Sequence, residues 1–208
     1  GNISFLNNSF KYKPSEVLIN GISQGNSCKT ICYFEDNITN VTIIYDYQLD
    51  TLNPMFKNLK NIKEIDLSNF DSSKVISMVE MFNGCSNLEK IIFGNINTSL
   101  VANFNSLFKN CNKLKSIDLS NIDISKVTNM ESMFLGCSSI EKINFGNINT
   151  SSVETMRSML NTCSKLESLN LSSFDTSKVT TFEYMFIHCY KLSFIDLSSF
   201  NTPNLLNI

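Results

Sequence analysis

The sequence predicts an α/β solenoid, with a parallel β ladder on one face, short helices on the other and a small N-terminal β cap. The first observation behind this is a 26-residue repeat without insertion or deletion, marked by Cys85, Cys111, Cys137, Cys163 and Cys189. The second is a change of apolar spacing within each repeat, from alternation to a helical period. A fixed period of roughly 20–50 residues is typical of solenoids, whose coils bury their apolar sides only by stacking.

Each repeat begins with an expected strand. In residues 88–113, Leu88, Ile91 and Phe93 match an L-x-x-L-x-L pattern. Ile91 and Phe93 are two residues apart and would point into the core, whereas Lys90 and Ile92 would point outward. We therefore expect the equivalent strands of neighbouring coils to pair in register as one parallel ladder.

The second half of each repeat has the spacing of a helix. Met78, Met81, Phe82 and Cys85 stand at i, i+3, i+4 and i+7, which is one face of a helix of about two turns. The positions before this face hold residue types that favour a helix N-cap: Ser77, Asn103, Asn129, Thr155 and Thr181. The positions after it suit a left-handed cap in three coils: Gly84, Asn110 and Gly136.

A turn joins the strand to this segment, and its polar residue alternates along the chain: Asp71, Asn97, Asp123, Asn149, Asp175 and Asn201. Such side chains bond the nearby backbone and close turns. The alternative is a calcium-binding column, which would need several oxygens from each coil. The coils also alternate between "LSNFD" or "LSNID" and "FGNIN", so a 52-residue superperiod overlies the repeat.

The ends of the chain depart from the period. Residues 1–40 are expected to form the β cap, residues 41–208 the solenoid, and residues 41–66 a degenerate first coil. The last coil is incomplete at Ile208, so we expect further protein or a partner to cover it.

Composition and motifs argue against several functions. The 17 basic and 19 acidic residues give a net charge of −2, without the footprint of a nucleic-acid-binding protein. No stretch approaches the ~18 consecutive apolar residues of a membrane span, so direct membrane insertion is not expected. With a single histidine, His188, and no phosphate loop, we expect neither an enzyme nor a metal or cofactor site.

Two sets of residues are candidates for covalent modification. The periodic cysteines are expected to be buried thiols, whereas Cys28 and Cys32 lie in the cap and are candidates for a local disulfide. Asn-x-Ser/Thr sequons begin at Asn2, Asn7, Asn37, Asn40, Asn97, Asn149 and Asn170. The first four are the preferred glycan sites, because Asn97 and Asn149 lie in the turn column and a glycan on Asn170 would obstruct the strand face.

The outward strand face is the candidate binding surface. Its candidate residues are Glu64, Asp66, Lys90, Ile92, Asp118, Lys142, Asn144, Asn170, Phe194 and Asp196. The alternative is a merely solvated face. Ile92 and Phe194, if exposed, favour an interface with a protein or glycan partner.

Residues Ser116 to Phe145, "SIDLSNIDISKVTNMESMFLGCSSIEKINF", resemble the BspA-like leucine-rich repeat surface proteins. The match is to the subgroup whose repeats read roughly "LDLSNFDTSKVTNMSSMFxGCSSL" and covers about residues 41–208. Residues 11–40 resemble, more weakly, leader segments of related proteins in microbial eukaryotes. The resemblance implies a right-handed leucine-rich-repeat solenoid, a cell-surface or secreted location, and adhesion or host and matrix contact. It supplies no catalytic residues.

These observations lead to one functional expectation and one alternative. We expect a non-enzymatic extracellular or cell-surface module for binding or adhesion. The alternative is a structural subunit of an extracellular coat or filament, which would self-associate through the uncapped C-terminal coil.

Overall fold

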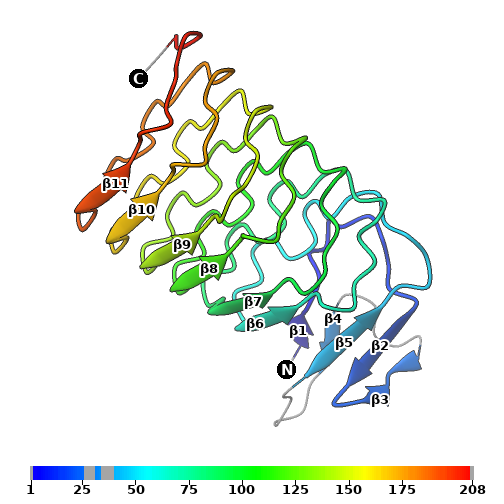
Figure 1. Ribbon diagram of the computed structural model, residues 1–208. Helices are drawn as coiled ribbons and strands as arrows, with labels where there is room; N and C mark the ends of the chain where they lie inside the picture. Colours follow the sequence, from blue (N-terminus) through cyan, green and yellow to red (C-terminus); the bar gives the residue numbers. More distant parts are fainter. Residues whose placement is uncertain (1, 26–30, 34–39, 207–208) are drawn as a thin grey trace.

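The computed structural model describes residues 2–25, 31–33 and 40–206, and in them the chain winds into a row of stacked coils (Figure 1). Six short strands lie side by side along one face of this row. They are β6 (Glu64–Asp66), β7 (Lys90–Ile92), β8 (Ser116–Asp118), β9 (Lys142–Asn144), β10 (Ser168–Asn170) and β11 (Phe194–Asp196). Their spacing of 26 residues is the period of the sequence, and the arrangement is compatible with a repeat solenoid.

The strands pair two by two, rather than as the single ladder expected from the sequence. β6 pairs with β7, β8 with β9 and β10 with β11, each parallel and in the expected register. At the end of each pair a leucine N–H donates to the next coil, as from Leu67 to the Ile92 carbonyl at 2.8 Å and from Leu119 to Asn144 at 2.8 Å. Phe93 and Phe145 stand in the leucine position of the alternate coils, and their N–H groups make no such bond within the described residues.

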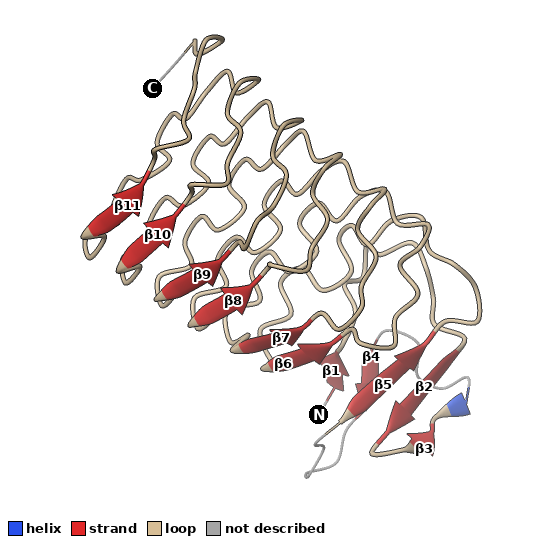
Figure 2. Ribbon diagram, viewed as in Figure 1, coloured by secondary structure: helices blue, strands red, loops and turns tan. Residues whose placement is uncertain are grey.

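The short helices predicted from the i, i+3, i+4, i+7 pattern are wrong. Figure 2 shows turns and loops where the helices were expected, and only Gly25 among the described residues is helical, in a 3₁₀ turn. Glu80 and Gly84 have φ values of 55° and 77°, so the backbone is left-handed at every fourth residue. A right-handed helix cannot continue through such positions. The same pair of positions is left-handed in the next four coils: Ser106 and Asn110, Ser132 and Gly136, Ser158 and Thr162, Tyr184 and His188.

The backbone hydrogen bonds of this segment run between coils instead. Glu80 and Phe82 donate to the Asn105 and Leu107 carbonyls of the next coil, both at 3.0 Å. The residues that alternate with these donate instead to the carbonyl three positions back and close tight turns, as Cys85 does to Phe82 at 3.1 Å. Parallel bridges continue without interruption through Thr51, Ser77, Asn103, Asn129, Thr155 and Thr181. We call this second set of bonds the turn ladder.

The core between the strands and the turn ladder contains the apolar columns that the sequence predicted. Phe56, Phe82, Phe108 and Phe134 stack with ring centroids 5.8, 5.5 and 5.2 Å apart and interplanar angles of 16° or less. The helical spacing thus identified the buried positions correctly, because two consecutive four-residue turns also bring i, i+3, i+4 and i+7 to the inside.

The periodic cysteines are free thiols, as predicted; four are buried and Cys189 is half-buried. Each donates to a backbone carbonyl one coil back, for example Cys85 to Phe56 at 3.0 Å and Cys137 to Phe108 at 3.0 Å. Burial raises the pKa of the Cys85 thiol to about 12 and also raises that of the Cys137 thiol well above its ordinary value. The column therefore serves packing, since reactive cysteines need a lowered pKa.

The N-terminal segment forms two small antiparallel sheets. β1 (Asn2–Ser4) pairs with β4 (Ile31–Tyr33), and β2 (Glu16–Ile19) lies between β3 (Ile22–Ser23) and β5 (Val41–Ile44). Four of its apolar side chains are buried in the same core as the coils: Phe5, Leu6, Phe10 and Val17. β5 falls in the region expected as a degenerate first coil, but it pairs with β2 and so belongs to the N-terminal sheet.

Candidate functional site

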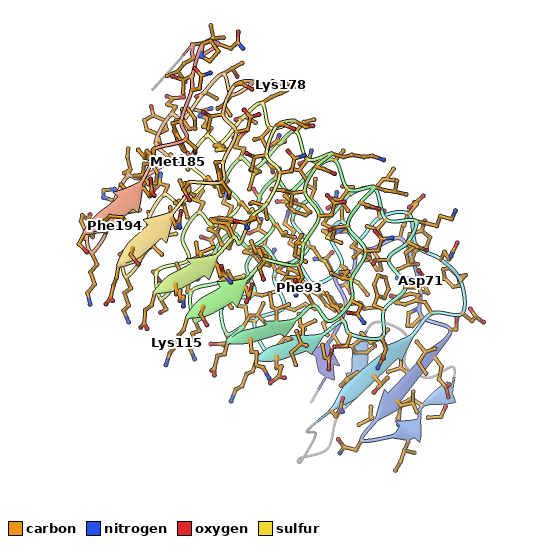
Figure 3. The ribbon with its side chains drawn as sticks, viewed as in Figure 1. Asp71, Phe93, Lys115, Lys178, Met185 and Phe194 are labelled. Atoms are coloured by element: carbon orange, nitrogen blue, oxygen red, sulfur yellow. The ribbon has the colours of Figure 1, made fainter. Side chains whose placement is uncertain are left out.

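The strand face presents two outward columns, separated by a buried residue in the middle of each strand. Figure 3 shows Lys115 and Phe194 along this face, while Asp71 and Lys178 lie on the edge farther from the strands. The middle residue is buried in β6, β8, β9 and β10 and half-buried in β7 and β11. This alternation follows from the period of two along a strand.

The first outward column carries exposed side chains. Lys90 Nζ lies 2.9 Å from Glu64 Oε1 in the register-paired strand, and both side chains are more than half exposed. Such an exposed pair contributes about 0–1 kcal/mol to stability. Lys142 is exposed, and Phe194 leaves 61% of its surface in contact with solvent. This column is therefore available to a partner.

The second outward column closes turns, a role that sequence reasoning missed. Each of its polar residues accepts, through Oδ1, the N–H of the residue two positions on. The bonds join Asp66 to Ser68 (2.8 Å), Asp118 to Ser120 (2.9 Å), Asn144 to Gly146 (3.1 Å), Asn170 to Ser172 (2.9 Å) and Asp196 to Ser198 (2.9 Å). The Asx-x-Ser/Gly spacing after each strand was the available signal.

These bonds lower the pKa values of the column's carboxyls. Hydrogen bonds from Ser68, Ser120 and Ser198 hold the pKa of Asp66, Asp118 and Asp196 below its ordinary value. The three groups are therefore carboxylates at neutral pH, each with one oxygen committed to its turn. Ile92, expected to be exposed, is only half-exposed and offers less apolar surface than predicted.

Tyr190 is a second exposed aromatic residue of the last coils and was not singled out from the sequence. It is 76% exposed, and its hydroxyl lies 2.6 Å from His188 Nδ1. The earlier members of its column are all polar: Lys60, Ser86, Asn112, Ser138 and Ser164. The change to an aromatic residue in one coil was the signal that could have found it.

The other predicted sites have mixed outcomes. Asn7 is half-buried and its Nδ2 donates to the Lys57 carbonyl at 2.8 Å, whereas Asn40 is exposed. Asn37, the side chain of Asn2 and the proposed Cys28–Cys32 disulfide lie outside the described residues; only the backbone of Cys32 is described, in β4.

The described surface includes two shallow hollows. One shallow hollow is lined by Ser15, Glu16, Ser23, Gly25, Ile44 and Asp46, and another by Glu154, Lys178, Thr180, Asn204 and Leu206. No cluster of three or more potential metal ligands occurs within 2–25, 31–33 and 40–206. Over the same ranges, the structure contains no helix with the length and hydropathy of a membrane span.

The comparisons with known proteins identify the repeat. A family model matches residues 50–145 and again 135–208, which is more than half of the chain. No curated protein matches the chain, and no solved structure does. The chain therefore belongs to the repeat family described as "Mycoplasma protein of unknown function, DUF285".

Proposed function

We propose that this chain is a non-enzymatic binding or adhesion module. In this proposal it is a leucine-rich-repeat solenoid of the BspA-like surface type, secreted or held at the cell surface. It contacts a protein or glycan partner through the strand face.

One observation carries the proposal: the coils keep their interior and vary their outward strand column. The inward columns repeat Val, Phe or Leu, and Cys, whereas the outward column reads Glu64, Lys90, Ser116, Lys142, Ser168 and Phe194. All six are exposed and held at fixed spacing by a buried core. A face with a fixed backbone and varied side chains is suited to recognition, because binding then orders the side chains without having to order the backbone.

The chemistry of the remaining groups supports a non-enzymatic role. Burial raises the pKa of the Cys111 and Cys137 thiols well above the range of a nucleophile. His188 is exposed and contacts Tyr190 rather than a carboxylate or a nucleophile.

The test is a comparison of charge reversals on two surfaces. The folded protein is probed against immobilised glycans and extracellular-matrix proteins, beside the double variants Lys90→Glu/Lys142→Glu and Lys126→Glu/Lys178→Glu. The first pair lies on the strand face, and the second is exposed on the turns away from it. We expect at least tenfold weaker binding from the first pair only. Equal loss from both pairs, or no effect of the first, would reject the strand face.

A structural subunit is the second candidate, favoured by the apolar side chains of the last described coil. Tyr184, Ile187 and Tyr190 are 47%, 40% and 76% exposed, at positions that are mostly polar in earlier coils. Such a patch is typical of a contact surface. If it joins copies of the chain, Ile187→Asn/Tyr190→Ser would dissociate the assemblies in analytical ultracentrifugation. A wild-type monomer at high concentration would reject this candidate.

A further inference from the structure

The alternation of Asp and Asn in the turn column has no explanation in the turn itself. Asp71, Asp123 and Asp175 accept the N–H of the serine two residues on, at 3.0, 2.9 and 2.9 Å. Asn97 and Asn149 make the same bond, both at 3.0 Å. Only the Oδ1 oxygen takes part, so either residue type closes the turn. The two residue types then differ in the negative charge of the Asp carboxylate and in the Nδ2 amide group of Asn, and the amide group can carry a covalent modification.

That amide group is free in both asparagines. Asn97 and Asn149 are exposed, and within the described chain their Nδ2 atoms make no hydrogen bond. Each begins an Asn-Thr-Ser sequon whose serine is the partner of its Oδ1. The middle residues of the two sequons, Thr98 and Thr150, are buried.

We propose that Asn97 and Asn149 carry N-linked glycans, a proposal that rests on export through a secretory route with an oligosaccharide transferase. Nδ2 would form a bond to the anomeric carbon of a sugar carried on a lipid pyrophosphate. The bond from that carbon to the pyrophosphate breaks, the lipid pyrophosphate leaves with the bonding electrons, and the amide proton passes to a base of the transferase. This proposal replaces the expectation from the sequence that Asn97 and Asn149 are poor glycan sites because they lie in the turn column.

Asn7 provides the contrast within the same chain. Its Oδ1 also accepts the N–H of the serine two residues on, at 2.8 Å. Its Nδ2, however, donates to the Lys57 carbonyl at 2.8 Å, and the side chain is half-buried between the N-terminal segment and that coil. A glycan there would have to displace this contact. We therefore expect Asn7 to be unmodified in the folded protein.

The two glycans would lie along one edge of the stack. Asn97 and Asn149 are two coils apart, roughly 10 Å by the strand spacing. Their column begins at Asp71, which lies on the edge away from the strands (Figure 3). Glycans there would cover that edge and leave the strand face open to a partner, so the modification would orient the module proposed above.

The experiment uses the full chain secreted from a eukaryotic host behind a heterologous export signal. Glycopeptides are mapped by mass spectrometry after release of N-glycans in ¹⁸O water. The matched variant is Asn97→Asp/Asn149→Asp, which keeps the turn oxygen used by Asp71. We expect glycans at both asparagines in the wild type, and loss of both masses in the variant with an unchanged thermal midpoint.

Secreted, folded wild type without glycans at these two positions would overturn the proposal. Occupancy of Asn170 would count against the strand face as a binding surface while leaving Asn97 and Asn149 as the glycan sites. Glycosylated protein that fails to bind the immobilised glycans and matrix proteins would reject the proposed function alone. The two failures are therefore distinguishable.

Discussion

Two kinds of coil alternate in this molecule, and they differ in how they join the next coil. Coils with Leu-Ser at the end of the strand, such as Leu67-Ser68, bond the following strand through the leucine N–H. Coils with Phe-Gly, at Phe93-Gly94 and Phe145-Gly146, make no such bond within the described chain. The turn ladder runs unbroken through both kinds. The turn ladder therefore supplies the backbone hydrogen bonds across the Phe-Gly junctions, where the strands do not pair.

The glycines explain part of this difference. Gly94 and Gly146 have φ values of 58° and 61°, which turn the chain out of the extended conformation directly after the strand. A Cβ on Gly94 would lie 2.4 Å from the Ser68 Cα, and one on Gly146 2.7 Å from the Ser120 Cβ. The Phe-Gly coil thus packs closely on the coil before it and loses the bond to the coil after it.

The largest expected effect comes from breaking the core that both kinds of coil share. Met133 is fully buried at the turn ladder, so Met133→Asp places a carboxylate without a partner in an apolar interior. We expect a loss of about 4 kcal/mol or more in the free energy of unfolding, measured by urea titration. The control is Lys126→Asp on an exposed turn, which should stay within about 0.5 kcal/mol. Similar midpoints for the two variants would contradict the shared core.

Gly94→Ala addresses the Phe-Gly coil alone. Gly94 and Gly21 both have a positive φ, but a Cβ on Gly21 meets nothing within 4 Å. Gly21→Ala should therefore cost only backbone strain, about 1 kcal/mol. Gly94→Ala adds a clash with the Cα and the side chain of Ser68, for an expected total of about 2–4 kcal/mol in urea unfolding. Equal losses for the two variants would show that the contact with Ser68 is unimportant.

Two buried threonines at junctions between coils differ in whether their hydroxyl has a hydrogen-bond partner. Thr150 Oγ1 donates to the Asp175 carbonyl at 2.9 Å and accepts the Asp175 N–H at 2.7 Å, whereas Thr98 Oγ1 is buried without a partner. Thr150→Val leaves both backbone groups unpaired, and we expect a loss of about 1–3 kcal/mol in thermal or urea unfolding. Thr98→Val should be neutral or stabilising. A larger loss at Thr98 than at Thr150 would reverse the assignment.

The sequence was sufficient for the period, the strand register and the buried columns, because these follow from where apolar residues recur. It was insufficient for the backbone of the second half-coil. Ser106, Ser132 and Ser158 adopt a left-handed φ without being glycine, and their identity gives no sign of it. The bonds between coils that stabilise this conformation form only after stacking. The turn role of Asp66 and Asp118 was predictable from the serine two residues on, but the exposed side of a strand suggested a partner instead.

The smallest expected effect is the acid sensitivity of the turns that contain aspartate. Hydrogen bonds from the hydroxyl and N–H of Ser73, with Gln48, lower the pKa of Asp71 to about 2. Because the pKa is depressed on folding, the stabilisation is complete above the ordinary value of 3.8 and is lost as the pH falls from there through about 2. Asp71→Asn converts this turn to the type found at Asn97, so its unfolding midpoint should fall less than that of the wild type between pH 4 and pH 2. Parallel curves for the two proteins over that range would mean that Asp71 does not stabilise the folded state as a carboxylate, and the two kinds of turn would then be equivalent in acid.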